Sequence, residues 1–298
     1  MSRVRKMRKP NFFIVGHTRS ATSSLLNELK QHPDVFIIHT GTGTTPAFFG
    51  YYSPLIKTED EYLELYTNAK NEKCVGEKNT DNLMCEESAP KIKKYYPDAK
   101  IIINLRNPID VMYSKHQVMV LLTMEPFTDF KEALQEGPER ERINKEQPGT
   151  YDENLLYRKM VRYPEQIKKY FDLFGRDKVH IRILDDIIQD ERLSFKKTCE
   201  FLEIDSDFQA IIEHKNSSRR YRVRSLQSLL KKLEGTKTRK ILSQIPGIQK
   251  LYNFVNLPQM EKKPLEINFR KKLSKEFESE IKELSNILGR DLSFWLNN

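Results

Sequence analysis

The chain has 298 residues, of which 38% are hydrophobic and 31% are charged. Its formal net charge of +9 favours polyanionic partners, which include nucleic acid, anionic polysaccharide, a membrane surface and a multiply phosphorylated nucleotide. No run approaches the roughly 18 apolar residues of a membrane span, and no apolar run follows the basic N-terminus, so we expect neither a membrane span nor a signal peptide.

Strands alternate with helices along the first two thirds of the chain. The apolar run 11–15 stops at Gly16, and Leu25, Leu26 and Leu29 then recur at helical spacing, which predicts a strand, a polar loop and a helix. Further strands are predicted at 73–75, 100–105 and 178–184, and helices at 60–68, 86–96, 109–122, 153–174 and 192–202. Such interleaving predicts a mostly parallel sheet covered by helices on both faces.

The remaining segments are more polar. Residues 136–149 are charged and contain two prolines, which predicts a mobile surface loop. Beyond Asn216 the chain is strongly basic, with predicted helices at 225–233 and 270–288 and a connecting loop at 257–264. We therefore predict one domain over residues 1–298, with an α/β core at 10–205 and a basic loop and helical C-terminal extension at 206–298.

Three cysteines, Cys74, Cys85 and Cys199, form an odd set without the spacing of metal ligands. This argues against a disulfide framework and against a zinc site. A reducing compartment, and hence the cytoplasm, is the simplest expectation.

The polar loop after the first strand is a candidate phosphate-binding loop. Free backbone N–H groups and the helix dipole favour an anion at such a strand–loop–helix junction. Arg19 adds a planar cation, and Thr22, Ser23 and Ser24 add hydroxyl donors. The loop lacks the Gly-Lys-[Ser/Thr] ending of a Walker A motif, which disfavours ATP hydrolysis. The alternative is a hydroxyl-rich cap on an ordinary helix.

A second candidate anion site follows the strand at 100–105. Arg106 lies at the strand end, and Ser114 lies eight residues later on the next predicted helix. Pro108 fits the first turn of that helix, and Asp110 complements its dipole. Both Arg106 and Ser114 can address one phosphate, although either residue alone also fits a strand cap or a solvent-facing position.

The two motifs together resemble one family. The pattern G-x-x-[K/R]-S-x-T-[ST] occupies 16–23, and L-R-N-P-x-D-x-x-x-S occupies 105–114, about ninety residues later. This pair is similar to that of the sulfotransferases that use 3′-phosphoadenosine 5′-phosphosulfate (PAPS), of the bacterial and carbohydrate type. The resemblance implies a P-loop-like three-layer α/β fold, PAPS as co-substrate, its bisphosphate PAP as product, and no required metal.

By position, the resemblance assigns the donor site. Arg19 would contact the 5′-phosphosulfate and stabilise charge on the departing nucleotide, while Arg106 and Ser114 would hold the 3′-phosphate. Arg19 stands where most members have lysine, and Ala21 where they have glycine. The 5′-phosphate would lie in the loop formed by Ser20, Ala21, Thr22, Ser23 and Ser24.

The segment after the second predicted strand is similar to the Glu-Lys-Thr-Pro element of carbohydrate sulfotransferases. By that match Glu77 is the general base that removes the acceptor proton, and Lys78 helps to orient the sulfonate. This sequence has Asn79 and Thr80 where the element has Thr-Pro. Other candidates for the base are His39 and His116, since some members use a histidine.

The C-terminal third adds a basic stretch that closes over the nucleotide in the family. It supplies four candidate clamps for the 3′-phosphate, namely Arg219, Arg220, Arg222 and Arg224. Residues 289–295 resemble the terminal element of bacterial members and are expected to pack the last helix. Residues 126–166 carry no recognisable signal, and we expect them to form part of the acceptor site.

Two other functions fit parts of the pattern. A P-loop kinase shares the strand–loop–helix arrangement, and a nucleic-acid-binding protein would explain the net charge and the C-terminal arginines. The favoured hypothesis is sulfuryl transfer to a hydroxyl or amine of a carbohydrate or glycoconjugate, with small molecules as the other acceptors, and without nucleic acid. The sequence indicates neither the acceptor's identity nor the oligomeric state.

Overall fold

The computed structural model describes residues 8–39, 48–50, 56–211 and 264–297. Five strands in this part form one sheet in the order β2-β3-β1-β4-β5, and every neighbouring pair is parallel. Parallel strands end at the same edge of a sheet, so the segments that follow β1, β3 and β4 emerge close together. The strands are β1 (Phe12–Gly16), β2 (Val35–His39), β3 (Cys74–Lys78), β4 (Lys100–Leu105) and β5 (Val179–Ile183).

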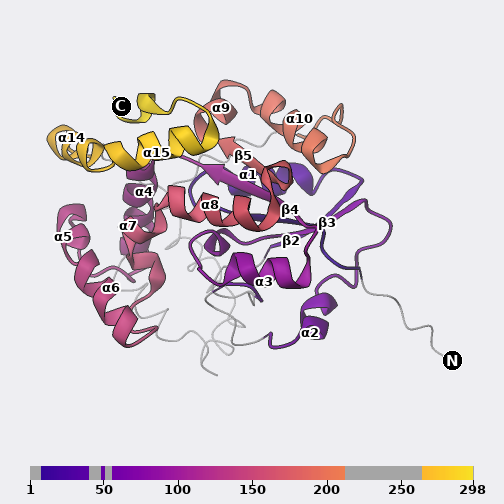
Figure 1. The fold of residues 1–298 in the computed structure, drawn as a ribbon, viewed down its shortest axis with the longest axis horizontal. Coiled ribbons are helices and arrows are strands. Elements are labelled where there is room, and N and C mark those ends of the chain that lie inside the picture. Colours follow the sequence, from indigo (N-terminus) through magenta and orange to yellow (C-terminus); the bar gives the residue numbers. More distant parts are fainter. Residues whose placement is uncertain (1–7, 40–47, 51–55, 212–263, 298) are drawn as a thin grey trace, which may run out of the picture.

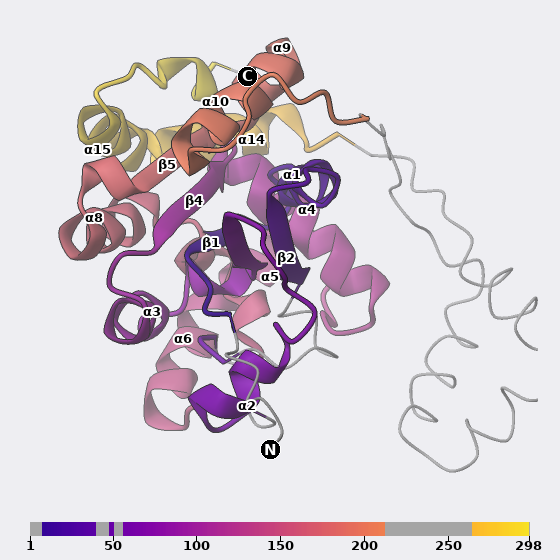
Figure 2. The same ribbon diagram turned by 90° about the vertical axis from the view of Figure 1, so that its right-hand side faces the viewer.

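Helices cover both faces of the sheet (Figures 1 and 2). One layer contains α1 (Thr22–Leu29) and α10 (Glu191–Leu202), and the other contains α3 (Ser88–Tyr95), α8 (Tyr163–Phe174) and α15 (Glu278–Leu288). The remaining helices are α2 (Glu59–Glu64), α4 (Pro108–Leu121), α5 (Phe130–Gln135), α6 (Gly137–Glu146), α7 (Tyr157–Met160), α9 (Leu184–Gln189) and α14 (Ile267–Glu276).

The two cores follow from side-chain alternation along the strands. In β1, Phe12 and Ile14 pack with α1 and α10, whereas Phe13 and Val15 join the larger core on the other face. All four side chains are fully buried. Complete burial of such a side chain contributes about 1.5–3 kcal/mol to the stability of the fold. Because the central strand is covered on both faces, all of its side chains lie in a core, and this explains its unbroken apolar run. The predicted three-layer fold around a mostly parallel sheet is confirmed.

The expected surface loop at 136–149 is wrong. Helix α6 begins at Gly137 and has Pro138 in its first turn, where a proline loses no hydrogen bond. Arg142 forms ion pairs along the helix, and Arg140 is buried in a two-pronged ion pair with Glu125, at 2.8 Å for each prong. The two prolines therefore flank a helix rather than interrupt a loop.

Two other sequence expectations need correction. The helix predicted at 153–174 is divided into a short 3₁₀ turn (Glu153–Leu155), α7 and α8, because Pro164 starts a new helix. The sequence reading gave no strand at β2, which is an edge strand only partly buried.

The C-terminal segment packs back onto the core. The helix predicted at 270–288 is two helices, α14 and α15, that meet at the buried Phe277. The predicted helix 225–233 and loop 257–264 lie outside the described residues. None of the helices in the described part of the chain combines the length and apolar character that a membrane crossing needs.

Candidate functional site

The loop between β1 and α1 is anchored to two other elements. The backbone N–H of His17 donates to the carbonyl of Asn104 at 2.6 Å, and the side-chain amide of Asn104 donates to the carbonyl of Ser20 at 2.8 Å. His17 is buried, and its Nε2 donates to the carbonyl of Met160 at 2.8 Å. Burial lowers the pKa of His17, which keeps the ring neutral. The loop is thus held against β4 and the end of α7.

The loop conformation leaves the start of α1 uncapped. Arg19 and Ala21 both have left-handed backbones, with φ of 63° and 59°. Ala21 is the N-cap residue, and in the described part of the chain no side chain accepts a hydrogen bond from the first turn. By contrast, Asn107 caps α4 by accepting from the N–H of Ile109. The first-turn N–H groups of α1 therefore remain available for an anion, which argues against the ordinary hydroxyl cap.

The predicted hydroxyl residues line this helix start to different degrees. Ser20 and Thr22 are buried, Ser24 is half-buried and Ser23 is exposed. The structure thus places all of them, together with Ala21, at the helix start that the sequence assigned to the 5′-phosphate.

The two predicted anion motifs meet directly. Nε of Arg19 donates to Oγ of Ser114 at 2.8 Å, and a guanidinium N–H of Arg106 donates to the carbonyl of Arg19 at 3.3 Å. These contacts join residues 95 and 87 positions apart in the chain. They form because β1 and β4 are neighbours and their following segments emerge at the same edge.

The electrostatics of this edge favour an anion. The pKa of Arg19 is lowered first by burial and then by the positive charge of Arg106. Arg106 has one carboxylate partner in the described residues, Asp110, at 3.5 Å, and Asp110 also accepts from Arg270 at 2.8 Å. Arg19 and Arg106 thus lie close together, and the carboxylate of Asp110 is divided between Arg106 and Arg270. A phosphate would stabilise the two neighbouring guanidinium groups.

Glu77 lies near the end of β3 and is 0% exposed. Its carboxylate accepts from the hydroxyl of Tyr62 at 2.5 Å, and the hydroxyls of Tyr62 and Tyr66 lie 2.7 Å apart. The pKa of each tyrosine is raised well above its usual value, first by burial and then by the charge of Glu77. Glu77 is therefore enclosed by aromatic side chains, and its role as general base stays a prediction.

The other catalytic candidates, Lys78, His39 and His116, differ in their burial and in their hydrogen-bond partners. Lys78 is 6% exposed and donates to Nε2 of His39 at 3.2 Å. Burial lowers the pKa of Lys78 to about 8, and burial together with the charge of Lys78 lowers the pKa of His39 to about 4. His116 is buried, donates from Nε2 to the carbonyl of Phe127 at 2.9 Å and packs against Phe130. These contacts give His116 a place in the core.

The sequence reading missed charged groups beside the phosphate loop. Lys115, next to Ser114, is only 8% exposed; its charge acts on His17 and Asp81, and the charge of Arg19 acts on it. Asp81 is half-buried in the 3₁₀ turn after β3 (Thr80–Asn82), and burial raises its pKa. Their sequence signals were slight, because Lys115 looks like one more polar residue on a helix and Asp81 like an ordinary turn residue.

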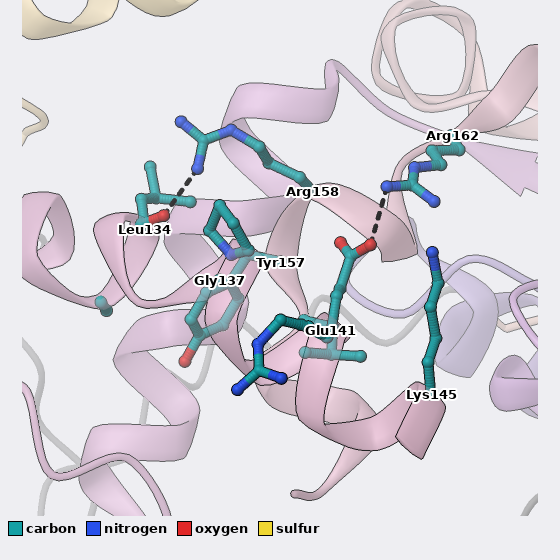
Figure 3. A pocket seen from close by; sticks show the side chains of 11 residues that line it. Leu134, Gly137, Glu141, Lys145, Tyr157, Arg158 and Arg162 are labelled. Atoms are coloured by element: carbon teal, nitrogen blue, oxygen red, sulfur yellow. Dashed lines mark hydrogen bonds and ion pairs between the residues drawn. The ribbon is translucent and has the colours of Figure 1, made fainter. Parts of the chain in front are cut away.

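The segment without sequence signal, 126–166, forms a cavity of about 310 Å³ between α5, α6 and α7 (Figure 3). Arg162 pairs with Glu141 at 2.9 Å, and Arg158 donates to the carbonyl of Leu134 at 2.7 Å. Lys145 lies on the same wall and has no ion pair among the described residues. The expected arginine clamp, Arg219, Arg220, Arg222 and Arg224, lies outside the described residues.

Known proteins resemble this chain in sequence and in fold. A sulfotransferase from Alicyclobacillus acidocaldarius has a solved structure with a TM-score of 0.70 and 27% identity, covering 97% of this chain and 99% of that one. The mouse sulfotransferase SULT7A1, solved in complex with PAP, has a TM-score of 0.44 and 17% identity, covering 80% of this chain and 68% of that one.

A curated relative matches a smaller part. The membrane-associated sulfotransferase kil1 of Dictyostelium discoideum is 29% identical over 111 residues, which are 37% of this chain and 23% of that protein. A sequence profile described as the sulfotransferase domain matches residues 9–244. This match spans both anion motifs and most of the chain, and the chain therefore belongs to the sulfotransferase domain family.

Proposed function

We propose that the protein transfers the sulfuryl group of PAPS to an acceptor hydroxyl or amine. The observation that carries this proposal is the contact between the two anion motifs, in which Arg19 binds Ser114 and Arg106 binds the backbone of Arg19. Two anion sites joined in this way suit a nucleotide with phosphates at both its 3′ and 5′ positions. ATP has no 3′-phosphate to occupy the second site.

Each part of the site has a role in donor binding. The uncapped first turn of α1 and the left-handed loop before it would bind the 5′-phosphate through backbone N–H groups, with Thr22 and Ser24 beside them. Arg106 and Ser114 would bind the 3′-phosphate, and Arg19 would reach the bridging oxygen. Charge-assisted hydrogen bonds of this kind are about twice as strong as neutral ones.

The reaction is an in-line displacement at sulfur. A lone pair of the acceptor oxygen or nitrogen forms the new bond to sulfur, while the bond from sulfur to the bridging oxygen breaks and its electron pair stays on the 5′-phosphate of PAP. The acceptor proton passes to a general base, which we assign to Glu77. Arg19 and Lys78 would stabilise the charge on the departing phosphate and on the sulfonate.

The burial of Glu77 sets a condition on this assignment. Oε2 of Glu77 accepts from Tyr62 and the whole side chain is 0% exposed, so an acceptor proton reaches the carboxylate only when the bound acceptor displaces the side chains around it. Asp81, half-buried in the turn that follows, is the competing carboxylate.

We propose a carbohydrate or glycoconjugate as the acceptor. The cavity between α5, α6 and α7 combines an apolar wall with Lys145, Arg158 and Arg162, the last paired with Glu141, a lining that fits the apolar ring faces and the hydroxyl groups of a sugar. Small hydroxyl compounds are the other class to screen.

Calorimetric titration of the purified protein with adenosine 3′,5′-bisphosphate, without magnesium, tests the donor site. We expect micromolar binding, with AMP and ATP at least about tenfold weaker because each lacks the 3′-phosphate. Absence of binding, or a preference for ATP that appears on adding magnesium, would contradict the proposal and favour a kinase-like nucleotide site. A positive result would justify an acceptor screen with PAPS.

A further inference from the structure

Lys115 is a buried ammonium at the reaction edge of the sheet. It lies on α4 directly after Ser114 and is 8% exposed. In the described ranges, no hydrogen bond and no ion pair within 4.0 Å is formed by the Lys115 side chain, and its Nζ is not among the fully enclosed side-chain atoms that lack a partner. Burial of a lysine side chain without an ion-pair partner is costly, and an anionic ligand beside the ammonium would offset that cost.

Three other elements converge on Lys115. Its charge acts on His17 in the phosphate loop, and it is itself affected by Arg19, Asp81 and Asp152. The turn that carries Asp81 packs on the start of the loop, because the N–H of Leu83 donates to the carbonyl of Val15 at 2.8 Å. Lys115 therefore lies between the phosphate loop and the end of β3.

The nearby carboxylates leave the ammonium unpaired. Asp152 caps the 3₁₀ turn at Glu153–Leu155 and accepts from the backbone and side chain of Asn154 at 2.8 and 2.9 Å. Asp81 approaches Lys115 only as a longer-range charge. Burial lowers the pKa of Lys115, the charges of Asp81 and Asp152 oppose this shift, and the charge of Arg19 adds to it. An incoming anion would stabilise the protonated form further.

We propose that Lys115 binds the sulfonate group of the donor, as a second cation beside Arg19. This inference rests on the proposed function. As the acceptor attacks sulfur, the bond to the bridging oxygen breaks and its electrons remain on PAP. The ammonium of Lys115 keeps its proton and donates to the sulfonate oxygens throughout, while the acceptor proton goes to the carboxylate base.

The test compares PAPS with PAP, because the two differ in the sulfonate alone. Calorimetry on Lys115→Met and Lys115→Gln, without acceptor, is expected to show PAPS affinity lowered at least about tenfold and PAP affinity changed less than about twofold. Thermal unfolding of Lys115→Met is expected at the wild-type temperature or above it, because the variant removes an unpaired buried charge. Lys197→Met, an exposed lysine on α10, is the matched control.

Two results would overturn the inference. Equal loss of PAPS and PAP affinity would assign Lys115 to the phosphates instead. Unchanged affinities with a lower unfolding temperature would make it a structural ion-pair partner of Asp81 and Asp152. Failure of the proposed function is a separate result, since the wild-type protein would then bind neither PAP nor PAPS.

Discussion

Two neighbouring regions of the sheet edge contain charged side chains but give them different partners. One region is the edge at β1 and β4, which carries the phosphate loop, and the other is the end of β3. At the β1–β4 edge, Arg19 lies close to Arg106; in the described residues the only carboxylate partner of Arg106 is Asp110, which also pairs with Arg270, and the first turn of α1 has no side-chain cap. At the end of β3, the Glu77 carboxylate accepts from Tyr62, and Lys78 donates to His39. Within the described part of the chain, the first region has more cationic and N–H groups than anionic partners, whereas the charged groups of the second have hydrogen-bond partners within the protein.

This difference separates a preformed site from one that needs rearrangement. Unpaired cations held by a fixed backbone bind an anion with little reorganisation. A carboxylate that is fully buried has to become accessible before it can accept a proton from a ligand, although a hydrogen bond to one of its oxygens leaves the other free to accept. We therefore expect nucleotide binding to need little movement of the protein. Access of the acceptor to Glu77, by contrast, is expected to need a rearrangement of the surrounding side chains.

Arg106→Ala should have the largest effect. Loss of the guanidinium leaves the 3′-phosphate unpaired, which should weaken binding of PAP by about 2–4 kcal/mol. Calorimetry measures this directly, with Arg176→Ala as the control, since that exposed arginine lies before β5 and donates to the carbonyl of Ile287. PAP affinity within about twofold of wild type in Arg106→Ala would remove this residue from the donor site.

Glu77→Gln should have the next largest effect. It keeps the shape of the side chain and an acceptor for Tyr62 but removes the base, so turnover should fall about 10²-fold while PAP binding persists. Steady-state kinetics and calorimetry on the same preparation measure both quantities. Asp81→Asn is the matched variant: near-normal turnover in Glu77→Gln together with a large loss in Asp81→Asn would transfer the base role to Asp81.

Lys78 predicts an alkaline limit to activity. Burial lowers its pKa to about 8, so the ammonium is charged below that pH and loses its proton above it. If its charge stabilises the sulfonate, turnover should fall about tenfold for each pH unit well above 8. Lys78→Arg keeps the charge and should move this limit upward. A pH–rate profile with the same alkaline limit in wild type and Lys78→Arg would exclude Lys78 as the titrating group.

Ala21→Gly should have the smallest effect. The residue has a left-handed backbone, with φ of 59°, which glycine adopts without steric cost. We expect a net gain of about 0.5–1 kcal/mol in stability and a rise of roughly 2 °C in the unfolding temperature. Differential scanning calorimetry measures this shift. A lower unfolding temperature would show that the Ala21 methyl group contributes packing that outweighs the strain.

The donor side could be predicted because its signals are local. The buried strand β4 contains the apolar run 101–103, and Arg106 lies just before the helix that carries Ser114. The burial of Glu77 could not be predicted, because Glu77 is on strand β3 and Tyr62 lies 15 positions away on helix α2. The burial of Lys115 could not be predicted, because it depends on which elements pack against α4. Helix α6 was missed because prolines at both ends resemble loop signals.

Asp110 couples nucleotide binding at Arg106 to the docking of the C-terminal helix α14. It is the shared counter-ion of Arg106 and of Arg270 on α14, so a phosphate that draws Arg106 away leaves Asp110 to Arg270 alone. Coupling free energies are reciprocal, so nucleotide binding should tighten the docking of α14 as much as that docking favours binding. Amide hydrogen exchange in α14 should therefore be slower with nucleotide bound than without it, although α14 lies near the opposite end of the chain from the phosphate loop.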